Sequence, residues 1–85
     1  MQMVIIDVPF GKNIQRIRKS RNMTQEDAVA ELQLRGSRMS RCTLAHIERG
    51  RRNIKINDLV LMKMVYDVDF DAFFNYDTQE NGKEK

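Results

Sequence analysis

Apolar residues recur every three or four positions through most of the chain, the spacing that places side chains on one face of an α-helix. This pattern predicts five helices. The first extends from about Gly11 to Arg21, the second begins at residues 23–27, the third occupies residues 40–50, and the last two follow Asn57 and Asp69 as N-caps. In the first three, the buried residues are expected to be Phe10, Ile14, Ile17, Ala28, Val29, Leu32, Leu44 and Ile47. In the last two, a core or a dimer surface is expected from Leu59, Val60, Met62, Met64, Val65, Phe70, Phe73 and Phe74.

The predicted third helix has a favourable capping residue at each end. Ser40 suits the N-cap because its hydroxyl can accept from a free backbone N–H, and Gly50 suits the left-handed residue that commonly follows a helix. Leu44 and Ile47 are three positions apart and share one face. The helix therefore has a narrow apolar stripe and a wide polar surface.

The second helix and the turn after it carry further local signals. Thr24 can cap this helix, and Asp27 can complete a box-like arrangement in its first turn. A glycine within residues 33–39 marks that segment as a long turn, with Leu34 or Met39 tucked beneath it. The two helices on either side of this turn are therefore expected to be joined by an unusually long connection.

Both ends of the chain lie outside the helical pattern. Residues 1–10 include the β-branched run Met-Val-Ile-Ile-Asp-Val, which predicts an extended arm that either packs across the helices or pairs with another copy. Residues 77–85 contain no apolar side chain and are predicted to be a disordered tail. The folded domain is expected to span residues 11–76, and the opening residues read as neither a signal peptide nor a membrane span.

Length and charge narrow the function classes. A chain of 85 residues makes one domain that buries only about 60–65% of its unfolded surface, so a deep catalytic pocket is hard to accommodate. Residues 35–55 contain seven basic side chains and one acid, whereas residues 58–85 contain three bases and seven acids. Beside a capped helix, the basic block predicts a surface that meets phosphate.

Cys42 and His46 are the residues that most invite a chemical interpretation. A single cysteine excludes an internal disulfide and is typical of a reducing cytosol, which predicts a cytoplasmic protein. Cys42 and His46 are four apart and share a helix face, but a metal would need further ligands and a nucleophile would need an orienting third group. We therefore expect no metal, no cofactor and no enzymatic activity.

Two motifs in this order resemble the Cro and phage-repressor type of helix-turn-helix domain, also called the Xre family. They are Thr-Gln-Glu at residues 24–26 and Ser-Arg-x-Thr-Leu-x-x-Ile-Glu-x-Gly at residues 40–50. The resemblance extends from Ile14 to Phe74 and implies an all-α, compact five-helix lambda-repressor-like domain. The chain departs from the family between Leu32 and Ser40, where about five extra residues lengthen the turn.

The resemblance implies roles for individual residues. Helix 40–49 would enter the major groove, where Arg41 can make a forked hydrogen bond to guanine and His46 can donate to a purine acceptor. Cys42 and Ala45 would contact a thymine methyl group. Phosphate contacts are expected from Gln25, Thr43, Arg49, Arg51, Arg52 and Lys55.

Outside the predicted DNA contacts, one ion pair and two further arginines also carry expectations. Arg18 and Glu48 would form a structural ion pair, as in the family. Arg35 and Arg38, in the lengthened turn, either touch the DNA backbone or point elsewhere, and the sequence does not decide between these alternatives.

The sequence therefore predicts a sequence-specific double-stranded DNA-binding regulator, by resemblance a repressor. A domain of this size reads a half-site, so a homodimer on an inverted repeat is expected, paired through the fifth helix or the N-terminal arm. The alternative is a protein-interaction module, such as an antitoxin that binds a partner protein, with DNA binding secondary.

Overall fold

The computed structural model describes residues 10–74, and this part of the chain is helical, with no β-strand. The elements are α1 (Phe10–Ser20), α2 (Gln25–Leu34), α3 (Arg41–Glu48), α4 (Ile56–Tyr66) and the 3₁₀-helix η1 (Phe70–Phe74). The predicted all-α class with five helical elements is confirmed. The expected arm, apart from its last residue, and the expected tail lie outside the described residues.

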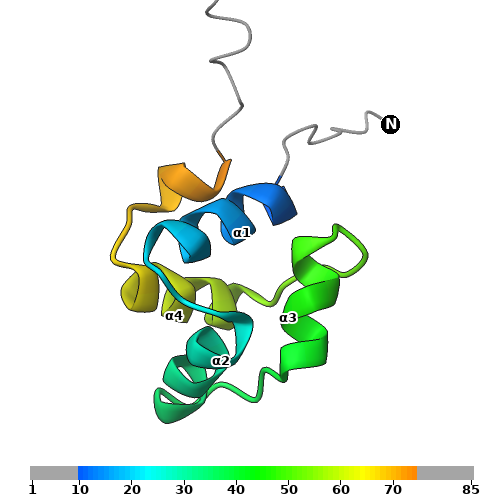
Figure 1. Cartoon of the computed structure of the whole chain (residues 1–85), viewed down its shortest axis with the longest axis vertical. Helices are drawn as coiled ribbons and strands as arrows, with labels where there is room; N and C mark the ends of the chain where they lie inside the picture. The colour runs from blue at the N-terminus through cyan, green and yellow to red at the C-terminus, as the bar shows by residue number, and fades with distance from the viewer. Residues whose placement is uncertain (1–9, 75–85) are drawn as a thin grey trace, which may run out of the picture.

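The helices pack as α1 against α3 and η1, and as α2 against α3 and α4. Figure 1 shows α3 standing at one side of α1, α4 and α2, so that one of its sides remains free of the other helices. The domain therefore presents α3 on its surface while anchoring it through both α1 and α2.

Side chains cap two of the helices as the sequence predicts. Thr24 Oγ1 accepts from Asp27 N and Asp27 Oδ2 accepts from Thr24 N, each at 3.0 Å, which completes the capping box. These two hydrogen bonds lower the pKa of the Asp27 carboxyl. Ser40 Oγ accepts from Thr43 N at 3.1 Å.

The predicted N-cap of α4 is wrong. This helix begins at Ile56, with Lys55 in the N-cap position and no side-chain capping hydrogen bond. Asn57 therefore lies within the first turn, where the helical backbone is already formed.

Four helices end in the same way, with a residue in the left-handed conformation. In each case the N–H after that residue bonds to the carbonyl five positions earlier, the closure of a Schellman motif. The left-handed residues are Asn22 (φ 60°), Gly36 (φ 100°), Gly50 (φ 76°) and Asp67 (φ 57°), and the bonds are Met23 N to Arg18 O, Ser37 N to Leu32 O, Arg51 N to His46 O and Val68 N to Lys63 O.

Hydrogen bonds hold the long turn between α2 and α3. Ser37 is buried, and its hydroxyl donates to Asp58 Oδ1 and accepts from Met39 N, both at 2.9 Å. Gln33 Nε2 donates to Met39 O at 2.8 Å. Of the two candidates for the residue beneath the turn, Met39 is 3% exposed and Leu34 is 79% exposed. The turn is thus tied to both α2 and α4.

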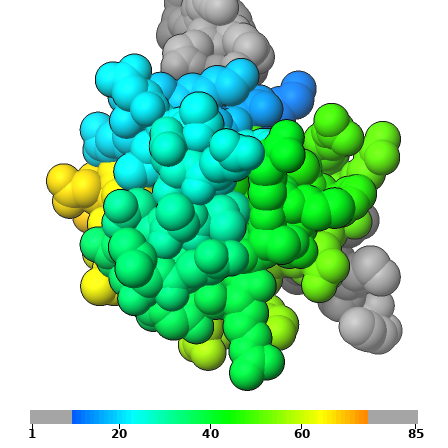
Figure 2. Space-filling view, turned by 60° about the horizontal axis from the view of Figure 1, so that its bottom comes forward, coloured from blue at the N-terminus to red at the C-terminus, as the bar shows by residue number. Residues whose placement is uncertain are grey.

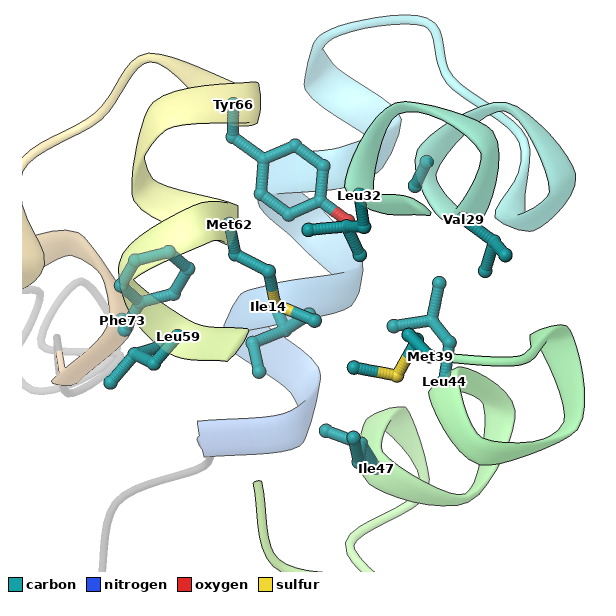
Figure 3. Packing of buried hydrophobic residues seen from close by; sticks show 11 residues of the cluster. Ile14, Val29, Leu32, Met39, Leu44, Ile47, Leu59, Met62, Tyr66 and Phe73 are labelled. Carbon is teal, nitrogen blue, oxygen red and sulfur yellow. The ribbon is translucent and has the colours of Figure 1, made fainter. Parts of the chain in front are cut away.

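The hydrophobic core lies where the helices meet (Figure 3). Val60 and Met64, on α4, turn outward, with Met64 57% exposed. The core consists of Ile14, Ala28, Val29, Leu32, Met39, Leu44, Ile47, Leu59, Met62, Tyr66 and Phe73.

Gly11 lets the first turn of α1 approach the end of α3. A Cβ atom at this position would lie 2.7 Å from the Glu48 carbonyl oxygen and closer still to that of Ile47. Both are backbone atoms that cannot rotate away. The spacing of α1 and α3 therefore depends on the missing side chain.

We expect Gly11→Ala to lower the free energy of unfolding by about 1–3 kcal/mol, because the methyl group must push α1 and α3 apart. Helix propensity alone would favour alanine by about 1 kcal/mol, so the sign of the change identifies the cause. Urea denaturation measures it. Lys12→Ala, at the exposed neighbouring position, is the control, and a Gly11→Ala variant as stable as this control would contradict the prediction.

Tyr66 is fully buried, and its ring extends from α4 toward Leu32 (Figure 3). Its hydroxyl has no hydrogen-bond partner among residues 10–74. Burial, assisted by the negative charge of Glu48 and opposed by Arg18, raises the pKa of the phenol well above its ordinary value of 10.0. Because the folded pKa exceeds the unfolded one, the neutral phenol stabilises the fold below pH 10, and this contribution is lost as the pH rises further.

Tyr66→Phe is therefore expected to stabilise the domain by about 1 kcal/mol near neutral pH, since an unpaired buried hydroxyl is removed. The gap between variant and wild type should widen by about 1.4 kcal/mol at pH 11, where only the unfolded wild-type tyrosine ionises. Chemical denaturation across pH 7–11 measures both effects. Parallel stability curves for the two proteins over that range would refute the titration argument.

Candidate nucleic-acid interface

The α3 helix buries one side and exposes the other. Leu44, Ile47 and Glu48 are buried, as the apolar stripe predicts for the first two. The residues predicted to contact bases all retain solvent access: Arg41 and Cys42 are exposed, and Ala45 and His46 are half-buried. The accessible side of α3 thus carries a guanidinium, a thiol, a methyl group and an imidazole.

Basic side chains continue along the surface from the end of α3. Ile54 is half-buried and packs against the core, which anchors the loop between α3 and α4. In the space-filling view this loop, in lime green, adjoins the green surface of α3 (Figure 2). The exposed bases are Arg49, Arg51, Arg52 and Lys55.

Gln25 and Thr43, also predicted as phosphate contacts, are half-buried and already engaged within the protein. Gln25 Nε2 donates to Glu48 Oε1 at 3.0 Å, and Ser40 Oγ donates to Thr43 Oγ1 at 2.9 Å. An amide nitrogen carries two hydrogens, so this bond leaves Gln25 one donor for an external acceptor. The sequence contained no signal for the bond between Gln25 and Glu48.

Arg18 and Glu48 form a buried, two-pronged ion pair between α1 and α3. Arg18 Nε lies 2.7 Å from Glu48 Oε2, and Arg18 Nη2 lies 3.0 Å from Glu48 Oε1. A third donor, Arg18 Nη1, bonds to Met23 O at 2.8 Å. Hydrogen bonding to Glu48 raises the pKa of Arg18, although burial opposes the shift. With Gln25 added, Glu48 joins α1, α2 and α3.

Two hollows border the α3 surface and bring in residues that the predicted site did not include. The larger, open groove contains Lys12 and Gln15 of α1 opposite Arg49, Arg51 and Arg52. A smaller cleft beside Thr43 contains Arg38 and Asn53. The outward bases on α1 and in the long turn were visible in the sequence, but their nearness to the α3–α4 loop depends on the fold.

Within residues 10–74, no group of three or more histidine, cysteine or acidic side chains is arranged to hold a metal ion. Cys42 and His46 therefore gain no third ligand there. None of the helices in the same range is long and apolar enough to cross a membrane.

Comparisons with known proteins agree with this architecture. The chain resembles the crystal structure of the restriction-modification controller protein C.AhdI from Aeromonas hydrophila, with a TM-score of 0.67 and 20% sequence identity over 78% of this chain and 92% of that chain. At this identity the likeness shows the fold. No curated protein matches the sequence. A helix-turn-helix family model matches residues 14–73, which is most of the chain, and the protein therefore belongs to the Cro/C1-type (Xre) helix-turn-helix family of DNA-binding transcriptional regulators, which are not enzymes.

Proposed function

We propose that this regulator binds a specific double-stranded DNA operator with α3 in the major groove and represses transcription from the promoter that the operator overlaps. The observation that carries the proposal is the division of α3, which buries Leu44, Ile47 and Glu48 and exposes polar side chains beside a basic loop. A helix of eight residues with one free side suits the width of the major groove.

The side chains on and around α3 divide into base contacts and phosphate contacts. Arg41, in the first turn, presents a planar fork that matches the O6 and N7 acceptors of guanine. His46 donates to a purine acceptor, while Cys42 and Ala45 contact a thymine methyl group. Arg49, Arg51, Arg52 and Lys55 neutralise phosphates, and Gln25 and Thr43 donate to the backbone at the edge of the groove.

The functional unit is a homodimer on an inverted repeat. Two observations support this: the domain is small enough to read only a half-site, and α4 and η1 expose apolar side chains. The N-terminal arm, the other predicted pairing element, lies outside the described residues. The exposed apolar residues of α4 and η1 are Ile56, Val60, Met64, Phe70 and Phe74. Such a dimer acts in the cytoplasm, where bacterial and phage DNA is transcribed.

A protein-interaction module, such as an antitoxin, is the second candidate. The observation that favours it is the same apolar side of α4, where Ile56, Val60 and Met64 are spaced four residues apart and exposed. A partner protein that covers this side in place of a second copy would make DNA binding secondary. The experiment below distinguishes the two candidates.

Selection of fragmented source-genome DNA on the purified protein at about 150 mM salt should recover a few fragments that share an inverted repeat, because nonspecific phosphate attraction is weak at that salt. Sequencing of the bound fragments measures this. Recovery of nothing, or of random fragments that salt readily removes, would count against the operator proposal and favour the protein partner.

Arg41→Ala and Arg52→Ala should weaken binding in different ways. Loss of a forked contact to guanine costs about 1–3 kcal/mol on the operator and relaxes specificity at one base pair. Loss of Arg52, a phosphate contact, should weaken operator and random DNA alike and reduce the slope of log K against log salt by about 0.9. Fluorescence anisotropy on both DNAs measures the two patterns, and equal losses on operator and random DNA for both variants would show that Arg41 reads no base.

A further inference from the structure

The lengthened turn between α2 and α3 builds one wall of a small basic cleft. Arg38 of the turn lines a hollow of about 100 Å³ together with Arg52, Asn53 and Lys55 of the α3–α4 loop. Thr43, on α3, lines the same hollow, so the cleft borders the helix proposed to enter the major groove. Three basic residues from the two loops therefore line one hollow.

Arg38 occupies an exposed position between two anchored residues of the turn. Its two neighbours, Ser37 and Met39, are buried, and Ser37 is hydrogen-bonded to Asp58 of α4. Arg38, between them, is exposed and lines the cleft. The other arginine of the turn behaves differently, because Arg35 Nη1 pairs with Glu31 Oε1 at 2.9 Å along the surface of α2.

The electrostatic balance of the cleft favours an anion. Arg38 forms no ion pair with any acidic side chain within residues 10–74. Asp58 is the acid that lines the cleft, and its Oδ1 accepts from Ser37. Two of the residues that line the cleft, Lys55 and Asp58, are the N-cap and a first-turn residue of α4, an 11-residue helix that no side chain caps. The positive end of that helix dipole adds to the three cationic side chains.

We propose that this cleft binds one backbone phosphate of the operator DNA, with Arg38 on one side and Arg52 and Lys55 on the other. This inference rests on the proposed function and adds Arg38 to the phosphate contacts, while it excludes Arg35. A phosphate seated here flanks the groove that α3 enters, so the lengthened turn widens the footprint of the domain on the DNA backbone.

The test compares Arg38→Ala with Arg35→Ala, a matched variant in the same turn. Anisotropy titrations with operator and with random DNA, over a range of salt concentrations, measure affinity and salt dependence. Arg38→Ala should weaken binding to both DNAs by about fivefold at 150 mM salt and reduce the slope of log K against log salt by about 0.9. Arg35→Ala should change neither quantity, and Arg38→Lys should retain most of the affinity.

A double variant tests whether Arg38 and Arg52 share one phosphate. If they do, the fold-loss of DNA affinity in the double variant Arg38→Ala/Arg52→Ala should be smaller than the product of the two single fold-losses. Either single change would already weaken the contact with that phosphate. Thermal unfolding of each variant verifies that the fold is intact.

Failure of the inference is distinguishable from failure of the proposed function. If the wild-type protein binds neither the operator nor random DNA, the proposed function fails. If the wild type binds DNA with a steep salt dependence but Arg38→Ala behaves like Arg35→Ala, the function stands and the phosphate cleft is refuted.

Discussion

The buried ion pair between Arg18 and Glu48 is the interaction on which the arrangement of the helix-turn-helix depends. Glu48 is the last residue of α3, and its two oxygens receive donors from α1 and α2. Arg18 also bonds to the Met23 carbonyl, in the connection between those two helices. Removing one partner would leave a buried charge uncompensated, which typically costs about 3–5 kcal/mol. The pair therefore fixes the orientation of α3 relative to α1 and α2, because α3 cannot rotate about its axis without breaking several charged hydrogen bonds together.

This constraint matters because α3 is too short to be stable as an isolated helix. It has eight residues and buries two apolar side chains, Leu44 and Ile47, whereas isolated helices shorter than about 12–15 residues are marginal in water. The N-cap at Ser40 and the left-handed Gly50 define its ends, and contacts with α1 and α2 define its orientation. A surface helix held in this way keeps its exposed side chains in a fixed relation to the basic loop that follows it.

The long turn is also held in a fixed conformation, by burial and hydrogen bonds instead of an ion pair. The turn is not a flexible insertion, because Ser37 and Met39 are both buried. Ser37 bonds to α4 and Met39 bonds to α2, so the extra residues become part of the folded surface. Ordering these residues costs conformational entropy, which burial of Met39 and satisfaction of the buried Ser37 hydroxyl offset. The two exposed arginines of the turn, Arg35 and Arg38, then differ in surroundings although they lie three residues apart.

The sequence by itself determined the helices, the capping box at Thr24, the cap at Ser40 and the outward side of α3. These features depend on residue spacing and hydrogen bonds within one or two helical turns. Its resemblance to the family also indicated the ion pair between Arg18 and Glu48. The tertiary structure alone decided that Gln25 bonds to Glu48, that Gly11 must lack a side chain, that Met39 rather than Leu34 lies beneath the turn, and that Arg38 and Arg52 line the same cleft. It also decided that α4 starts before Asn57 and turns Met64 outward. Each of these depends on how segments distant in the chain pack, and local spacing carries no information about which distant atoms will meet.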